Sequence, residues 1–226
     1  MANESRYESD VLQTSMGELR LTFLGHGTLM LSIGDKTIHI DPYGRVADYT
    51  TLPKADLVLV THEHHDHLDT QALTKVWTEA TDVVVTEGCL GEVKGGIVMR
   101  NGDVKTLQGI KIEAVPAYNI VHTRGSGQPF HPKGSGNGYV LTFGDTRVYI
   151  AGDTENTPEM KALKEIDVAF LPMNLPYTMS PEMVADAAKA MQPKIVYPYH
   201  FGDTDTADLE RLLADTGIEV RVRSLA

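Results

Sequence analysis

Short apolar runs separated by turn residues fill the first part of the chain, and this pattern predicts a sheet built from neighbouring strands. Three runs predict antiparallel strands, at residues 19–24, 29–33 and 37–40. Gly34-Asp35 lies between the last two runs and is typical of a tight turn. The continuous apolar run at 57–60 suits a strand that is buried on both faces. A helix over 70–79 and a strand over 83–85 are expected to follow.

The second half of the chain repeats this order of elements. Further strands are predicted at residues 104–107, 110–115, 139–143, 148–150, 168–171, 195–197 and 218–222. Thr157 and Ser180 are each followed by proline and then glutamate, so both predict the N-cap of a helix. A last helix is expected over 207–214. Strands with interspersed helices in both halves favour an α/β sandwich.

Length and charge narrow the class of protein. The 226 residues suit one domain over residues 1–226, with 1–14 as a polar lead-in. A formal net charge of -11 argues against a general nucleic-acid-binding surface, because phosphate contacts require clustered lysine and arginine. The single cysteine, Cys89, excludes an intrachain disulfide. We therefore expect a small-molecule substrate rather than a nucleic-acid partner.

The sequence also bears on localisation. No apolar run reaches the ~20 residues of a membrane span, so no membrane partner is expected. The polar start MANESRYESD has no signal-peptide core. We expect a cytoplasmic protein, with a secreted one as the alternative if a signal peptide was removed before residue 1.

The densest chemical signal is the segment VTHEHHDHLD at residues 60–69, which directly follows a predicted buried strand. Four of the nine histidines lie here, and His62, His64, Asp66 and His67 form the pattern H-x-H-x-D-H. Neutral imidazole nitrogens and carboxylate oxygens both bind zinc at about 2.0–2.2 Å. The alternative is a cluster of polar surface residues at the start of a helix, which would account for one acid as the N-cap but not for four histidines in six positions. The segment therefore predicts a metal site.

This pattern resembles the signature of the metallo-β-lactamase superfamily, and later motifs extend the resemblance over nearly the whole chain. Asp41 in HIDP matches the acid at the end of an early strand, Asp153 in AGDT matches the later aspartate, and His200 in YPYHFG matches the late histidine. PAYN and FHPKG are similar to the branch of L-ascorbate-6-phosphate lactonase-like proteins. The resemblance implies an αββα sandwich with a metal site between its halves.

The resemblance also implies a binuclear centre with a defined ligand set. One metal ion would be held by His62, His64 and His131, and a second by Asp66, His67 and His200, with Asp153 bridging them. The expected ions are two divalent metals, with zinc first and manganese or iron as alternatives. Asp41 is expected beside the site, where it braces ligands through hydrogen bonds. Taken singly, Asp153 also fits a turn acid and His200 a buried structural histidine.

The third histidine motif has two candidates in a long loop, 119–138, that is rich in glycine and proline. His122 lies in IVHT and His131 in FHPKG. We predict His131 as the ligand, because FHPKG carries the resemblance to the lactonase-like branch, and His122 as an exposed loop residue. Irregular loops of this length in compact domains are often functional.

The ligand set predicts a chemistry. Two ions about 3.5–4 Å apart can share a bridging hydroxide, which predicts a metal-dependent hydrolase acting on an ester-like bond of a lactone, phosphoester or related small molecule. Asp66 is the predicted catalytic residue, because it can orient the hydroxide and carry a proton. His26 and Tyr177 are candidates for substrate contact, and each also fits a structural role. The alternative is a non-hydrolytic metal-binding, redox or sensor protein on the same fold.

Overall fold

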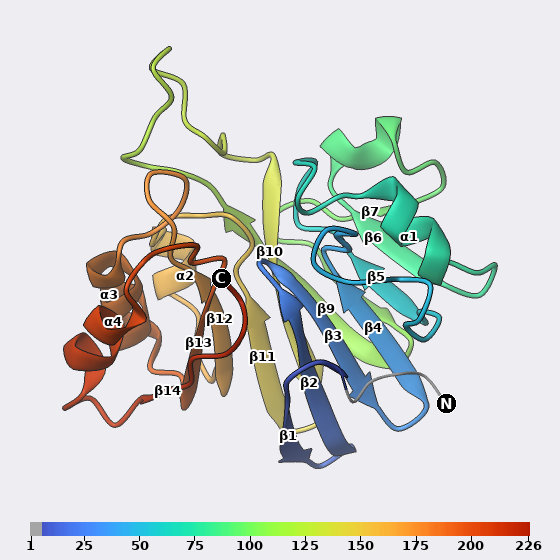
Figure 1. The fold of residues 1–226 in the computed structure, drawn as a ribbon, viewed down its shortest axis with the longest axis horizontal. Helices are drawn as coiled ribbons and strands as arrows, with labels where there is room; N and C mark the ends of the chain where they lie inside the picture. The colour runs from blue at the N-terminus through green and yellow to red at the C-terminus, as the bar shows by residue number, and fades with distance from the viewer. Residues whose placement is uncertain (1–5) are drawn as a thin grey trace.

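The structure, a computed structural model, describes residues 6–226 and contains two seven-stranded sheets. The sheets pack face to face and helices lie on their outer sides (Figure 1). The layers thus run helix, sheet, sheet, helix, which confirms the predicted αββα sandwich. Among the helices of residues 6–226, none combines the length and the apolarity of a membrane span.

The first sheet comes from the first half of the chain. Its strands pair in chain order: β1 (Ser9–Thr14), β2 (Gly17–Gly25), β3 (Thr28–Ile33), β4 (Lys36–Ile40), β5 (Leu57–Leu59), β6 (Asp82–Val85) and β7 (Ile97–Val98). Strands β1 to β4 pair antiparallel, whereas β4 to β7 pair parallel. Parallel neighbours need crossover connections. Helix α1 (Thr70–Val76) lies in the connection from β5 to β6, and the 3-10 helix η2 (Glu87–Gly91) in that from β6 to β7.

The second sheet shows the same division. Its strands are β8 (Val104–Leu107), β9 (Ile110–Ala117), β10 (Gly136–Phe143), β11 (Thr146–Ile150), β12 (Val168–Pro172), β13 (Ile195–Tyr199) and β14 (Glu219–Val220). Strands β8 to β11 pair antiparallel and β11 to β14 pair parallel. The crossovers contain α2 (Pro158–Lys161), α3 (Pro181–Met191) and α4 (Thr206–Leu213). Thr157 and Ser180 cap α2 and α3 as predicted, each accepting a backbone N–H bond.

Apolar side chains of the two sheets meet in the central layer. Leu21 and Leu31 from the first sheet and Leu141 and Phe170 from the second are fully buried there. Two outer layers pack the first sheet against α1 and the second against α2, α3 and α4. Burying a side chain of this size contributes about 1.5–3 kcal/mol. The sandwich therefore gives firm support to the loops at the strand ends.

The expectation that residues 1–14 form a polar lead-in is wrong for residues 9–14. They form β1, which pairs with β2 from Ser9 opposite Thr22 to Thr14 opposite Gly17. β1 is an edge strand with half-exposed side chains, so its composition carries little apolar signal. The part of the prediction that covers residues 1–5 lies outside the described residues.

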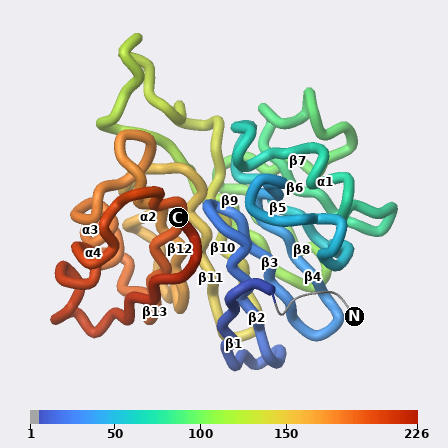
Figure 2. The backbone as a smooth tube through the Cα atoms, in the orientation of Figure 1, coloured from blue at the N-terminus to red at the C-terminus, as the bar shows by residue number. Residues whose placement is uncertain are grey.

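Smaller differences concern the ends of elements. The helix predicted over 70–79 ends at Val76, because Trp77 adopts extended backbone. Short elements such as β7 and η2 carry too few residues to show a period. The loop between β9 and β10 projects from the sheets (yellow-green in Figure 2). It is shorter than the loop predicted over 119–138, because Gly136 and Gly138 belong to β10.

Candidate metal centre

Six of the seven predicted ligands lie on loops that leave the parallel parts of both sheets, and the seventh, His131, lies on the loop between the antiparallel strands β9 and β10. His62 follows β5, Asp153 follows β11 and His200 follows β13. In open α/β sheets, ligands commonly bind outside the carboxyl ends of parallel strands. The structure brings all seven predicted ligands, and His26, into two groups whose nitrogen and oxygen atoms lie within 4.8 Å of one another. The groups are His62, His64, His131 and Asp153, and His26, Asp66, His67 and His200.

Asp153 lies between the two groups. Its Oδ2 atom is 3.3 Å from His131 Nε2 and 3.9 Å from His62 Nε2. Its Oδ1 atom is 3.4 Å from His67 Nε2 and 3.6 Å from His200 Nε2. One carboxylate thus presents an oxygen to each group, which is the position that a bridging ligand needs.

Buried polar atoms without partners show that these residues fit metal ions. His67 Nε2, both ring nitrogens of His200 and Asp153 Oδ1 are buried and form no hydrogen bond within the described residues. A buried polar atom left unsatisfied costs about 1–3 kcal/mol. Imidazole nitrogens and carboxylate oxygens are donors that zinc, manganese and iron accept. Bound divalent ions would therefore satisfy the atoms that the protein leaves unpaired.

Neighbouring groups fix the orientation of two ligands. His67 Nδ1 donates to Asp41 Oδ2 at 2.8 Å, and Asp41 also accepts from the backbone N–H and the hydroxyl of Thr61, both at 2.7 Å. His131 Nδ1 donates to Asn119 Oδ1 at 2.7 Å. Such bonds hold a ring in one tautomer and leave Nε2 free for a metal. Asp41 thus lies where the sequence predicted it, beside the centre.

The backbone of the centre is unusual at three positions. His26, Asp41 and His200 have φ values of 54°, 45° and 48°. Residues with a Cβ atom rarely adopt this left-handed region, and it costs about 1–3 kcal/mol at each position. These residues turn the chain sharply at the strand ends and so direct their side chains toward the centre.

Burial and charge set the protonation of the ligands. Burial lowers the pKa of His62 well below its usual value, and nearby His67 adds to this effect. Burial would raise the pKa of Asp66, but the neighbouring imidazoles, first His200 and then His26, hold it below its usual range. Burial would also raise the pKa of Asp153, whereas the charges of His200 and His67 lower it. Neutral imidazole and ionised carboxylate are the forms that bind metal. Burial would lower the pKa of His67, but the charges of Asp153 and Asp41 raise it well above its usual value, so an ion that binds there would displace a proton.

The loop between β9 and β10 places its two histidines differently. His131 is 5% exposed and lies in the first group of candidate ligands. His122 lies in neither group, and its Nδ1 atom donates to Glu155 at 2.7 Å. The expectation that His122 is an exposed loop residue is wrong, because its side chain is only 29% exposed and is held by Glu155. The ligand role of His131 itself stays a prediction.

Glu155 was not singled out by the sequence, although it organises this loop. Its buried carboxylate accepts backbone N–H bonds from Ile120, Val121 and His122, each at 2.7 Å. It also accepts from Asn119 Nδ2 at 3.1 Å. Burial would raise the pKa of Glu155, and these hydrogen bonds, first that of His122 N–H, lower it below its usual value. Since Asn119 also holds His131, Glu155 connects the loop to the ligands.

A cavity of about 440 Å³ opens beside the two groups of ligands. Its lining consists of His26, His64, His65, Asp66, Arg124, Phe130, His131, Asn174, Tyr177 and His200. Both candidates for substrate contact are therefore at the cavity. Tyr177 is 47% exposed, and His26 Nε2 lies 3.1 Å from Asp66 Oδ2, which also makes His26 a candidate ligand.

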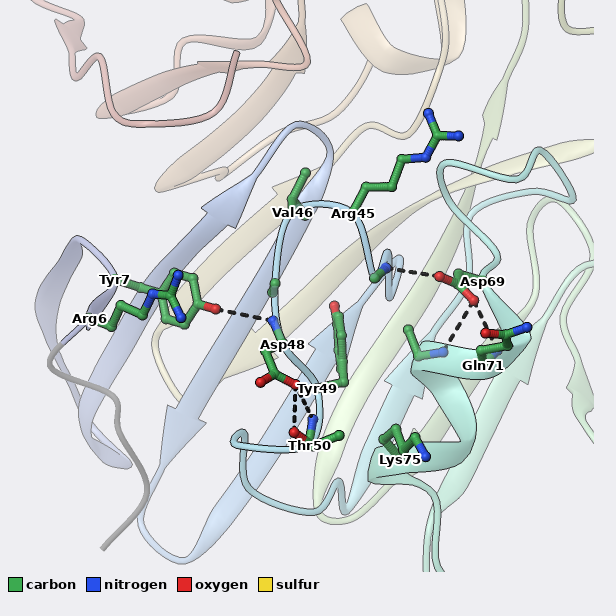
Figure 3. A pocket seen from close by; sticks show the side chains of 13 residues that line it. Arg6, Tyr7, Arg45, Val46, Asp48, Tyr49, Thr50, Asp69, Gln71 and Lys75 are labelled. Atoms are coloured by element: carbon green, nitrogen blue, oxygen red, sulfur yellow. Dashed lines mark hydrogen bonds between the residues drawn. The ribbon is translucent and has the colours of Figure 1, made fainter.

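A second cleft, of about 470 Å³, lies between Tyr7 and helix α1 (Figure 3). Its lining contains no histidine and mixes cations such as Lys75 with the acids Asp48 and Asp69. Asp69 is already used as the N-cap of α1, where it accepts from Gln71 N and Ala72 N. The two candidate metal groups belong to the smaller cavity, which is therefore the candidate active site.

Comparisons with known proteins agree with this geometry. A family model described as a beta-lactamase superfamily domain matches residues 20–200. A UPF0173 metal-dependent hydrolase from Methanopyrus kandleri is 30% identical over 220 residues, which cover 90% of this chain and 95% of the relative. A crystal structure of a protein from Parabacteroides distasonis shares 49% sequence identity and a TM-score of 0.93, and the match covers 97% of this chain and 100% of that chain.

A more distant structure shares the fold. Igni18, a metallo hydrolase from Ignicoccus hospitalis, is 24% identical with a TM-score of 0.73, over 92% of this chain and 96% of its own. The similarity in sequence and in structure thus extends over nearly the whole molecule.

Proposed function

This chain belongs to the beta-lactamase superfamily, among its metal-dependent hydrolases, and we propose that it cleaves an ester-like bond of a small molecule with the help of two divalent ions. A lactone or a phosphoester is the substrate class that we favour. Zinc is the metal that we favour, because mixed imidazole and carboxylate ligands suit it.

The position of Asp153 is the observation that carries the proposal. Its two oxygens face separate groups of histidines, and in the second group the facing atoms of His67 and His200 have no hydrogen-bond partner in the described protein. A single structural metal site would need only one such group. Two groups that share a carboxylate support a pair of ions, which is the arrangement of many hydrolytic centres.

When bound, the ions supply Lewis-acid polarisation of the scissile bond and a nucleophile derived from water at neutral pH. The chain supplies orientation and proton handling. Asp66 lies on the cavity wall, 23% exposed, and its Oδ2 atom accepts a hydrogen bond from His26 Nε2. This pair offers a path for a proton between the reacting atoms and solvent, with Asp66 as the acid-base group.

Replacement of Asp66 tests the proposal. Asp66→Asn keeps the shape of the side chain but removes its charge and basicity. We expect turnover of an ester or lactone probe to fall by about 10²–10⁴, and excess metal not to restore it when metal analysis shows two bound ions. Asp35→Asn makes the same change in an exposed turn and should leave turnover unchanged.

Two outcomes would contradict the proposal in different ways. Full recovery of Asp66→Asn on addition of metal would show that Asp66 is only a ligand. A fully metal-loaded wild-type protein that hydrolyses no lactone, phosphoester or thioester would favour the alternative, a non-hydrolytic metal-binding protein.

A further inference from the structure

One part of the cavity wall carries no metal ligand and lies beside the candidate metal centre. It is formed by Arg124, Phe130 and Tyr177, and we name it the aromatic-arginine wall. The Phe130 and Tyr177 rings pack edge to face, with their centroids 5.0 Å apart. The Arg124 guanidinium lies over the Phe130 ring, 5.1 Å from its centroid. Two loops thus combine to present a cation and two aromatic rings to the cavity.

The backbone around Arg124 is held in one conformation. Arg124 N donates to Gln128 O at 2.7 Å, and Gly127 N donates to Arg124 O at 2.8 Å. Thr123 and Pro129 pair as an isolated bridge at the base of this turn. Since the aromatic contact also restricts the side chain, the guanidinium loses little freedom when it binds a ligand.

The guanidinium has donors to spare. Its one side-chain hydrogen bond within the described residues runs from Nη2 to Phe130 O at 3.2 Å, and none of the described carboxylates forms an ion pair with it. Arg100, Arg147 and Arg223, by contrast, all pair with acids. An arginine has five N–H donors in a planar fork, and it binds carboxylate and phosphate groups through two of them at once.

The net negative charge of the molecule makes a cation at the cavity important for an anionic substrate. A net charge of -11 repels anions in general, so an anionic substrate needs a local site of opposite sign. Arg124 supplies that site at the cavity, next to the groups that would hold divalent ions. A neutral substrate could accept a hydrogen bond from this guanidinium but would not pair with its charge.

We propose that the substrate carries an anionic oxygen group, a carboxylate or a phosphate, which pairs with Arg124 while the bond to be cleaved lies at the metal centre. This inference rests on the proposed hydrolytic function for the position of the cleaved bond. It does not need that function for the binding of the anionic group, so the two can be tested separately.

Binding of three probes to the metal-loaded protein tests the inference. Phenylphosphonate and phenylacetate carry the two anionic groups, and phenylacetamide is a neutral relative of similar size. Their dissociation constants are measured by calorimetry for wild type, Arg124→Gln and Arg124→Lys. Arg45→Gln is the matched control, because it removes the same charge from a residue that lines the other cleft. Thermal unfolding of each variant shows whether the fold is kept.

We expect Arg124→Gln to bind at least one anionic probe about 10-fold to 100-fold more weakly than wild type, since hydrogen bonds to charged groups have this strength. Phenylacetamide binding should change less than twofold, and Arg45→Gln should resemble wild type. Arg124→Lys should lie between, because an ammonium group lacks the fork. A loss confined to phenylphosphonate would identify a phosphate-bearing substrate, and a loss confined to phenylacetate a carboxylate-bearing one.

Unchanged affinity of Arg124→Gln for both anions would overturn the inference and leave Arg124 as a residue that only packs on Phe130. Failure of wild type to bind either anion would overturn it as well. If neutral esters are hydrolysed while Arg124→Gln binds the anions normally, the inference fails alone. If the anions bind through Arg124 but no ester-like compound is hydrolysed, the proposed function fails and the binding site stands.

Discussion

Glu155 is the residue whose replacement tests most directly how the loop between β9 and β10 is held. Its Oε2 atom accepts the backbone N–H bonds of Ile120 and Val121, and its Oε1 atom accepts from His122 and Asn119. Asn119 in turn accepts from the backbone N–H and the ring of His131. Glu155→Gln removes the charge with almost no change in size, so it perturbs these bonds and little else.

The structure sets the expected magnitude. A glutamine places an NH₂ group at one of the two oxygen positions, so at least two donors lose their acceptor in either orientation. A donor left unsatisfied costs about 1–3 kcal/mol when buried. Ile120 and Val121 are partly exposed to water, so we take the lower end and expect a loss of about 2 kcal/mol. Because about 1.4 kcal/mol is a factor of ten, the closed loop should be disfavoured by roughly 30-fold.

Two measurements follow the loop. Amide hydrogen exchange should show faster exchange at Ile120, Val121 and His122 and unchanged exchange in the β strands. Metal titration should show affinity reduced by up to roughly 30-fold, because an open loop withdraws His131. Glu79→Gln is the control: Glu79 is exposed and lies outside this loop, so its replacement should affect neither measurement.

Retained protection of these amides in Glu155→Gln, with wild-type metal affinity, would refute the reasoning. It would mean that the loop is held by its own turns and that His131 does not depend on Glu155. Equal effects of Glu79→Gln and Glu155→Gln would refute it too, because then only the change in net charge matters.

Two further predictions concern histidines. His131→Ala should lower the bound metal or the activity by orders of magnitude, whereas His122→Ala should cost only its bond to Glu155; metal analysis and turnover of both variants check this, and the reverse order would show that His122 is the ligand. His39 is fully buried, its Nδ1 atom has no hydrogen-bond partner among residues 6–226, and burial lowers its pKa to about 4. Between pH 6.5 and 4, the unfolded chain therefore takes up a proton at His39, whereas the folded protein does not. His39 leaves the free energy of unfolding at its full value above pH 6.5 and lowers it by roughly 3 kcal/mol as the pH drops to 4. Urea unfolding across this range should show a shallower fall for His39→Gln, and identical slopes would contradict the prediction.

The candidate metal centre was predictable where it depends on residue type. Histidines and acids that gather in a tight loop after a buried strand are typical of a metal site, so the segment from His62 to His67 was found from local sequence alone. Strands with a strong apolar period, such as β2 and β9, were found for the same reason. Edge strand β1 was missed because its stability comes from pairing with β2, which leaves no apolar pattern in its own side chains.

Residues that act through the backbone or from a distant loop were not predictable. Glu155 accepts from backbone N–H groups 33 to 35 residues earlier in the chain, and any sequence offers such donors. The role proposed for Arg124 depends on its position beside Phe130 and Tyr177 at the cavity, and Tyr177 lies on another loop. Glu155 lies two residues after Asp153, but this position only weakly indicated a role in the site, because nothing in the local sequence shows that Glu155 is buried.

The left-handed backbone at His26, Asp41 and His200 has a consequence for the evolution of this protein. Glycine relieves the cost of that conformation, so selection for heat resistance alone would favour glycine at His26 and His200. At Asp41 it would not, because glycine would leave Thr61 and His67 without their acceptor. Exchange of either histidine would remove a side chain from the candidate centre. Stability and activity therefore compete at these two residues, and laboratory variants that gain stability there are expected to lose activity.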